Sequence, residues 1–243
     1  MKIILLSLLF IVQIFGQYPD ASGIMQKIDQ NMSANNQIVV STMVIHGRRG
    51  SRSITSKSWI QGTEKSFTEY LAPPREKGTK MLKIDNQLWI YSPQSDRIIR
   101  ISGHMLRQSL MGSDLSYEDM MDDRQLVDIY SAKIVGEEQI NNRDCWIMEL
   151  TAKADNLAYY TQKYWVDKEY MIPLKEHLFA KSGKLLKTIE LSELFQIENR
   201  WYPKQMLFQD VLLKGKGTEF IIESIKFDQD IPEYIFTKAA LRK

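Results

Sequence analysis

The side chains that most often carry out covalent or metal chemistry are few in this sequence, and they are scattered. None of the three histidines, His46, His104 and His177, is spaced with another histidine, a cysteine or an acidic cluster as metal ligands are. The single cysteine, Cys145, lies in the alternating run "CWIMEL", where a buried strand residue is expected rather than a reactive thiol. There is no G-x-S-x-G motif. The sequence therefore predicts no catalytic residues, no metal site and no cofactor, and we expect a protein that is not an enzyme.

Methionine and leucine are concentrated instead in "HMLRQSLMGSDLSYEDMM", residues 104–121. Methionine is unbranched and polarizable, so it adapts to irregular surfaces and to varied apolar partners. Two interpretations of this stretch stay open. Its methionines fill the hydrophobic core, or they form an adaptable flap over a cavity.

Residue spacing in this stretch predicts two short helical pieces. Leu106 and Leu110 are four residues apart and would share one face of a helical turn. Gly112 then interrupts the pattern as a hinge. Ser116 and Asp119, three residues apart, form a capping-box pattern that would begin the second piece.

The elements that must position this stretch are mostly strands. Ile24 and Ile28 predict an amphipathic helix over 21–33. From Gln37 onward the chain is rich in β-branched and aromatic residues, which predicts about ten or eleven antiparallel strands when 159–180 is counted as one run. Runs such as "IVVSTMVI" and "LWIY" are apolar on both faces. They indicate a curved sheet, an open or partial β-barrel, whose inner face is covered by helices or holds an apolar guest.

The N-terminus has the order of a secretory signal peptide. Lys2 is followed by an apolar run over 3–15 and by the small residue Gly16. This run is shorter than the about 20 residues that a membrane-spanning helix needs. We therefore expect residues 1–16 to be removed on export, and residues 17–243, which contain no linker, to form a single domain.

The charge of the chain disfavours one class of partner. The 32 basic and 30 acidic residues nearly balance, which argues against nucleic acid as a partner. Three arginines, Arg48, Arg49 and Arg52, cluster in the first predicted hairpin. They either keep a turn solvated or contact an acidic partner or anionic lipid headgroups. The glycine-containing run "KGKGTEF", residues 214–220, lacks the spacing of a phosphate-binding loop and is interpreted as a hairpin turn.

Three segments carry a resemblance to a known family. They are "KGTKMLKIDNQLWIYSPQSDRIIRIS", "MGSDLSYEDM" and "YWVDKEYMIPLKEHLFAKSGKLLKTIEL", which together cover residues 77–191. In this order they resemble the outer membrane lipoprotein-sorting protein family, the LolA-like periplasmic carriers, with relatives that have the LolB, LppX and RseB folds. The "GSDLSYEDM" part is the most specific of them.

The resemblance implies a mainly β fold: an unclosed barrel of about eleven antiparallel strands with short helices across its concave face as a lid. It also implies a periplasmic carrier that binds acyl chains of lipoproteins or other lipids and shuttles them towards the outer membrane. Such a carrier would have a transporter in the inner membrane as donor and an outer-membrane acceptor. The alternative is an RseB-like regulatory sensor of lipids or lipoproteins that binds a membrane signalling partner.

Candidate contacts for an acyl chain come from the central strands and from the methionine-rich stretch. Side chains alternate between the faces of a strand, so either Leu88 and Ile90 or Trp89 and Tyr91 face the cavity, and the sequence leaves this choice open. The full set is Met81, Leu88, Trp89, Ile90, Tyr91, Met105, Leu106, Leu110, Met111, Met120 and Met121.

Overall fold

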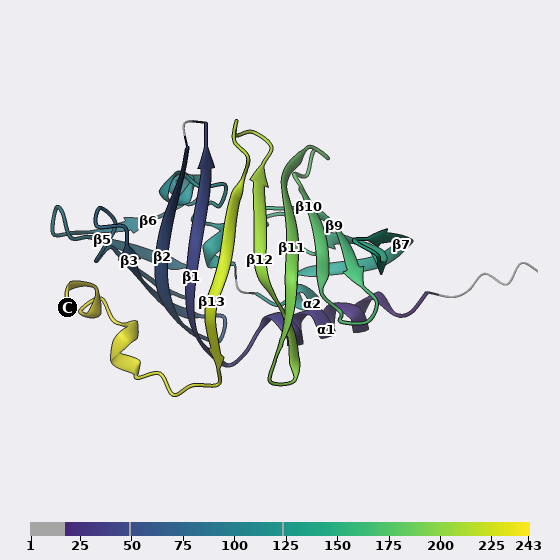
Figure 1. Ribbon diagram of the computed structural model, residues 1–243, viewed down its shortest axis with the longest axis horizontal. Helices are drawn as coiled ribbons and strands as arrows, with labels where there is room; N and C mark the ends of the chain where they lie inside the picture. Colours follow the sequence, from purple (N-terminus) through teal and green to yellow (C-terminus); the bar gives the residue numbers. More distant parts are fainter. Residues whose placement is uncertain (1–17, 49, 123) are drawn as a thin grey trace, which may run out of the picture.

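The computed structural model describes residues 18–48, 50–122 and 124–243, and the predicted signal peptide, residues 1–16, lies outside them. The described residues form one antiparallel sheet of thirteen strands (Figure 1). The strands are β1 (Asn36–Gly47), β2 (Gly50–Gln61), β3 (Lys65–Ala72), β4 (Lys80–Ile84), β5 (Gln87–Ser92), β6 (Arg97–Ile101), β7 (Tyr130–Ile140), β8 (Arg143–Ala152), β9 (Thr161–Asp167), β10 (Pro173–Phe179), β11 (Leu185–Ile197), β12 (Arg200–Asp210) and β13 (Thr218–Phe227). The helices are α1 (Ala21–Met32), α2 (Leu126–Ile129) and the 3-10 turns η1 (Gly103–Arg107), η2 (Leu110–Gly112), η3 (Asp119–Met121), η4 (Glu233–Phe236) and η5 (Ala240–Arg242).

Two meanders meet in the middle of this sheet. The strand order is β6-β5-β4-β3-β2-β1-β13-β12-β11-β10-β9-β8-β7, so the first and last strands of the chain pair at the centre. The sheet curves, and its two edges, β6 and β7, are consecutive in sequence but not hydrogen-bonded to each other. The barrel is therefore unclosed, as expected. The chain between β6 and β7, which includes the methionine-rich stretch, has to run from one edge of the sheet to the other.

The sheet has more strands than the sequence predicted, and the segment 159–180 shows one reason. It divides into β9 and β10 around a turn without glycine. The Asp167 carboxylate accepts hydrogen bonds from the backbone N–H groups of Glu169 and Tyr170, at 2.9 and 2.7 Å, and Met171 adopts a φ of 54°. An aspartate that bonds the backbone two and three residues ahead closes a turn without help from glycine.

Helix α1 forms where the sequence predicts it and covers part of the concave face. The Asp20 carboxylate caps it by accepting from the N–H groups of Ser22 and Gly23, at 3.2 and 3.0 Å. Ile24 and Ile28 are buried and pack on one cluster with side chains from β7 to β10. In Figure 1 the helix crosses behind the lower right part of the sheet.

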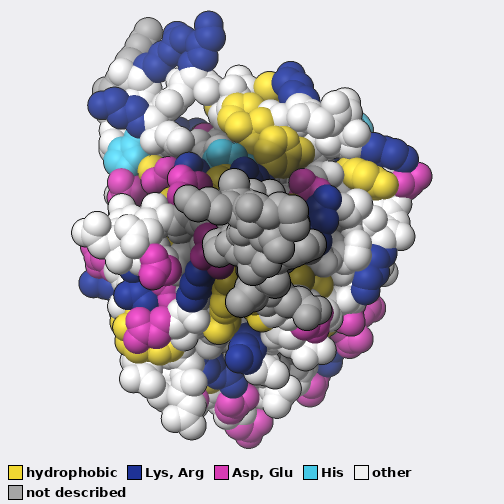
Figure 2. Space-filling model, turned by 90° about the vertical axis from the view of Figure 1, so that its right-hand side faces the viewer, with side chains coloured by type: hydrophobic (Ala, Val, Ile, Leu, Met, Phe, Trp, Pro, Cys, Tyr) yellow, Lys and Arg dark blue, Asp and Glu magenta, His cyan; other side chains and the backbone are white. Residues whose placement is uncertain are grey.

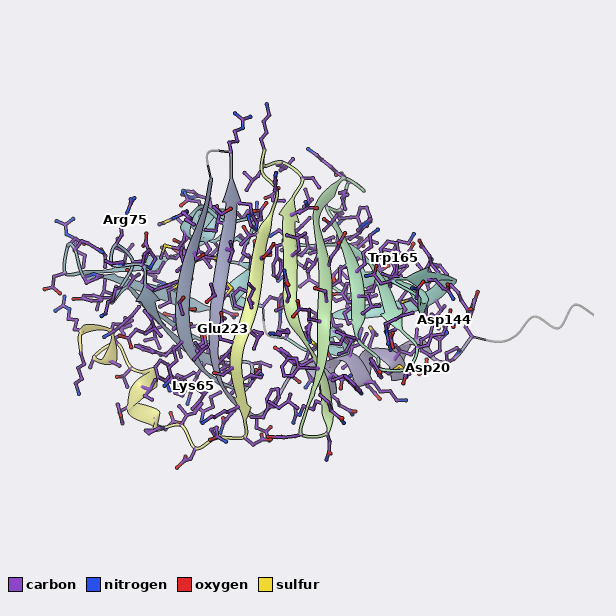
Figure 3. All side chains as sticks on the ribbon, in the orientation of Figure 1. Asp20, Lys65, Arg75, Asp144, Trp165 and Glu223 are labelled. Atoms are coloured by element: carbon purple, nitrogen blue, oxygen red, sulfur yellow. The ribbon has the colours of Figure 1, made fainter. Side chains whose placement is uncertain are left out.

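The C-terminal segment covers the opposite face of β3 to β5. Ile231, Phe236 and Leu241 pack there against Phe67 and Leu82. Lys65 of β3 donates to Glu233 of η4 at 2.9 Å and ties this segment to the sheet (Figure 3). The same strands are thus covered by separate apolar layers on both faces, which explains why their sequences show no clean alternation.

Candidate binding site

The connection between β6 and α2, residues 102–122, is called the flap below. It contains three 3-10 turns rather than two short helical pieces. Leu106 and Leu110 do not share a helical face, because η1 ends at Arg107 and Leu110 begins a separate turn. The chain reverses at Met111 and Gly112, which have φ values of 51° and 70°, and the Leu110 N–H donates to the Leu115 carbonyl at 2.7 Å. Gly112 therefore belongs to a tight reversal and is not a hinge between helices.

The predicted capping box is present in the flap. The Ser116 N–H donates to the Asp119 carboxylate at 2.6 Å, and the Asp119 N–H donates to the Ser116 hydroxyl at 3.1 Å. This reciprocal pair closes the turn that leads into η3, and Met120 and Met121 of η3 pack on the concave cluster.

Substituting Ser116 with alanine is expected to lower the free energy of unfolding by about 1 kcal/mol, the usual effect of losing an N-terminal cap. Urea denaturation followed by circular dichroism measures this loss. Threonine keeps the hydroxyl, so Ser116→Thr serves as the matched control and should stay close to the original protein. Equal stability of the alanine variant and the original would contradict the role given to this hydroxyl.

The second aspartate of "GSDLSYEDM", Asp119, fastens the flap to β11. The Asp119 carboxylate forms an ion pair with Lys187, which is only 4% exposed, and accepts a hydrogen bond from the Tyr159 hydroxyl at 2.6 Å. Burial, together with the nearby Asp119 charge, raises the pKa of Tyr159 far above its usual range, so this hydroxyl stays a donor. In the sequence Asp119 looks like a surface carboxylate, but in the fold it attaches the flap to Lys187 of β11.

The first acidic residue of the motif, Asp114, makes a second attachment close to the first, since Lys187 of β11 pairs directly with Asp210 of β12 in the sheet. The Asp114 carboxylate accepts from the Thr218 hydroxyl at 2.7 Å and from the Asp210 N–H at 3.0 Å. Its own N–H donates to the Thr218 oxygen at 3.0 Å. Asp114 thus joins the flap to the end of β12 and the start of β13.

The flap packs its apolar side chains onto the concave face of β1 to β6. Leu110 is 2% exposed, whereas the flap methionines are half-buried. Nine of the predicted contact residues gather in this one cluster: Met81, Leu88, Ile90, Met105, Leu106, Leu110, Met111, Met120 and Met121.

The remaining two predicted contacts lie on the other face. Trp89 and Tyr91 belong to the cluster under the C-terminal segment, where Lys238 stacks over the Trp89 ring at 4.3 Å. The structure therefore places Leu88 and Ile90 on the concave side and removes Trp89 and Tyr91 from the candidate site. The physical reason is the alternation of the strand together with a second apolar cover that the sequence pattern did not reveal.

Empty space on the concave side lies beside the flap rather than beneath its centre. The largest cavity, about 810 Å³, runs between α1, the central strands and the end of the flap. Its apolar lining comes from Ile28, Met32, Ala34, Ile60, Leu126, Tyr164 and Tyr202. A second cavity of about 500 Å³ shares Thr63, Asp122 and Arg124 with it and is bordered by Leu106 and Met121 of the flap.

A third cavity, about 690 Å³, lies at the far end of the flap, bordered by Arg52, Met111 and Gly112. Arg52 donates a hydrogen bond to the Met111 carbonyl there. Of the nine predicted contacts on the concave side, Leu106, Met111 and Met121 thus border empty space, and the other six lie within the packed cluster.

One ionisable residue stands out in the largest cavity. Glu176 of β10 lies at its floor, where burial raises the pKa of its carboxyl to about 7 and a hydrogen bond from the Tyr164 hydroxyl opposes the shift. Among the described residues no ion pair joins Glu176 to a cation. The sequence did not mark Glu176, Ile60 or Tyr202, because which strands meet over a cavity depends on sheet register.

The described part of the chain holds no group of three or more histidine, cysteine, aspartate or glutamate side chains arranged to bind a metal ion. None of its helices has the length and apolar character that crossing a bilayer requires. What the concave face offers is partly open space beside a fastened flap, with apolar side chains in its lining that could hold a flexible apolar molecule.

Comparisons with known proteins agree with this geometry. A family model described as that of an uncharacterized protein matches residues 62–243. None of the curated proteins matches the chain.

Several solved structures share the fold over nearly their whole length. A putative outer membrane lipoprotein-sorting protein domain from Vibrio parahaemolyticus is 24% identical with a TM-score of 0.78, and the match covers 91% of this chain and 98% of that one. A DUF1329 family protein from Desulfovibrio piger is 25% identical with a TM-score of 0.82, covering 90% and 97%. A LolA superfamily protein from Nitrosomonas europaea is 24% identical with a TM-score of 0.75, covering 92% and 100%. The chain therefore belongs to the family whose model it matches, and it has the fold of the outer membrane lipoprotein-sorting and LolA superfamily structures.

Proposed function

We propose that the protein is a periplasmic carrier that binds the acyl chains of lipoproteins or other lipids and shuttles them towards the outer membrane. The observation that carries this proposal is the cavity of about 810 Å³ between α1 and the sheet, where apolar side chains of α1, β2, α2 and β12 line a space that also has polar and charged walls and that reaches the end of the flap. Exposing a lipid tail to water costs about 0.8 kcal/mol per CH₂ group, so a molecule that moves lipids through water needs such a covered space.

The remaining parts of the proposal follow from this role. Residues 1–16 act as an export signal, and residues 17–243 form the mature single-domain carrier. The donor is an inner-membrane transporter and the acceptor lies at the outer membrane. Cargo contacts are made where the flap borders empty space, by Leu106, Met111 and Met121, together with the apolar lining of α1 and the central strands.

Uptake of acyl chains is the direct test. The mature protein, purified from the periplasm without detergent, should carry acylated molecules that mass spectrometry identifies after extraction. The emptied protein should bind a fluorescent fatty acid. If it neither carries nor takes up any acylated molecule, the proposal is wrong.

Filling the largest cavity should block this uptake. Ala34→Trp places an indole in the space beside Met32 and Tyr202 and is expected to lower affinity for the fluorescent fatty acid at least about tenfold, because the ring occupies the volume of several methylene groups. Val135→Trp is the control, since Val135 is 46% exposed on β7. Thermal melts establish that both variants fold. Unchanged affinity of a folded Ala34→Trp variant would remove this cavity from the proposal.

A further inference from the structure

Exposed apolar side chains are concentrated at one point of the described surface. Val211, Leu212 and Leu213 follow one another in the loop between β12 and β13, and Leu212 is 59% exposed. Consecutive exposed large aliphatic side chains at a loop are unfavourable in water unless they meet a partner.

Basic residues surround these three side chains. Lys214 and Lys216 follow in the same loop, and both are exposed. Arg48 is exposed in the neighbouring turn between β1 and β2, and the two turns are joined because the His46 N–H donates to the Gly217 carbonyl at 3.1 Å. Figure 2 shows Lys and Arg side chains projecting at the upper left of the molecule, the end where Figure 1 has these turns. The basic-apolar tip is defined as Arg48, Val211, Leu212, Leu213, Lys214 and Lys216.

The stem of this loop is held in place, so the exposure of its side chains is a property of the fold. The Leu212 N–H donates to the Asp210 carboxylate at 2.8 Å, and the Val211 N–H donates to the Leu186 carbonyl at 3.0 Å. Gly217 has a φ of 93°, and a Cβ there would lie 2.7 Å from the Phe208 carbonyl oxygen, so only glycine fits. The backbone bonds are satisfied, while the apolar side chains point away from the protein.

We propose that the basic-apolar tip docks the protein on the surface of an anionic phospholipid bilayer. The aliphatic side chains enter the boundary between headgroups and acyl chains, and the lysines and Arg48 pair with the anionic headgroups. Charge complementarity selects this occupant, because three cations next to aliphatic groups match a negatively charged interface that has an apolar layer beneath it.

The tip lies away from the largest cavity. The largest cavity is lined by the start of β1, the end of β2 and the turn between β11 and β12, which lie at the opposite ends of these strands. The tip instead lies at the end of the sheet where Asp114 fastens the flap to Asp210 and Thr218. Substitutions at the tip are therefore expected to leave the fatty-acid affinity unchanged, whatever the cargo is.

Vesicle sedimentation tests the proposal with the mature protein. Vesicles that contain one part phosphatidylglycerol to two parts phosphatidylcholine should bind the protein, and vesicles of phosphatidylcholine alone should bind it far less. Replacing both lysines, Lys214→Gln with Lys216→Gln, should weaken binding to the anionic vesicles about 30-fold at low salt. Leu212→Ser with Leu213→Ser should weaken it at least about tenfold at any salt concentration.

Ile99→Ser is the matched control, because Ile99 is 48% exposed on the edge strand β6, and it should bind as the original protein does. Equal binding to both kinds of vesicle, or full binding by the tip variants, would overturn the proposal. Binding only to vesicles that also contain membrane proteins would identify a protein as the occupant and would overturn it as well. Loss of vesicle binding with normal fatty-acid uptake leaves the carrier function intact, so failure of either proposal is recognised separately.

Discussion

Substituting Lys187 with methionine is expected to lower the free energy of unfolding by about 3–5 kcal/mol. The substitution keeps the length of the side chain but leaves the Asp119 carboxylate buried without its cation, and removing one partner of a buried ion pair has this effect. Asp119 also accepts hydrogen bonds from the Ser116 N–H and the Tyr159 hydroxyl, so an unpaired charge at Asp119 disturbs these two contacts as well. Urea denaturation followed by tryptophan fluorescence measures the change.

Two further variants isolate the ion pair. Lys187→Met combined with Asp119→Asn removes both charges and should recover most of the lost stability, because no buried charge is left unpaired. Lys133→Met breaks the exposed pair with Glu149, 2.7 Å apart on the sheet surface, and should change stability by about 0–1 kcal/mol. A Lys187→Met variant no less stable than Lys133→Met would show that Lys187 does not fasten the flap.

The features that the sequence predicted correctly depend on neighbours in the chain. Helix α1 follows from the spacing of Ile24 and Ile28, and the capping box follows from Ser116 and Asp119. The unclosed antiparallel barrel follows from strands that pair with the next strand in the chain, except that β6 and β7 are the unpaired edges and that β1 pairs with β13 at the centre. Such local patterns are visible in the sequence because the residues that form them are only three or four positions apart.

The features that the sequence did not predict depend on residues that are distant along the chain. Asp114 and Asp119 look like surface carboxylates until the fold brings Thr218 and Lys187 to them. Trp89 belongs to the outer face because the C-terminal segment returns to cover β5, which no pattern in "LWIY" indicates. The half-buried flap methionines combine features of both interpretations: they close the concave face of β1 to β6, and Met111 and Met121 also border empty space.

Glu176 makes the cavity sensitive to pH, and Glu176→Gln should reveal it. The pKa of this carboxyl rises from 4.5 to about 7 because the folded protein buries it. The folded state therefore binds the proton more tightly than the unfolded state does. Its contribution to stability is present below pH 4.5 and is lost as the pH rises through 7. At pH 5 the glutamine variant should match the original protein, and at pH 8 it should be more stable by about 1–3 kcal/mol.

Other ionisable groups face the same cavity, including Asp29, Asp122, Arg124 and Arg200, so the comparison must be between variants at each pH. Glu223→Gln is the control, because Glu223 is exposed on the outer face of β13 (Figure 3) and should leave the pH profile unchanged. If Glu176→Gln and the original protein show the same dependence of stability on pH between pH 5 and 8, the raised pKa does not belong to Glu176.

The same carboxyl should affect cargo binding. Below pH 7 it is mostly neutral and the floor of the cavity is closer to apolar, whereas above pH 7 an acyl chain would have to lie against a buried negative charge. Affinity for an uncharged fluorescent lipid is therefore expected to be several-fold higher at pH 6 than at pH 8, and Glu176→Gln should bind it equally well at both. An uncharged probe is needed, because a fatty acid titrates in this range itself. If the original protein binds the probe equally at both pH values, the acyl chain does not reach Glu176 and lies closer to the flap.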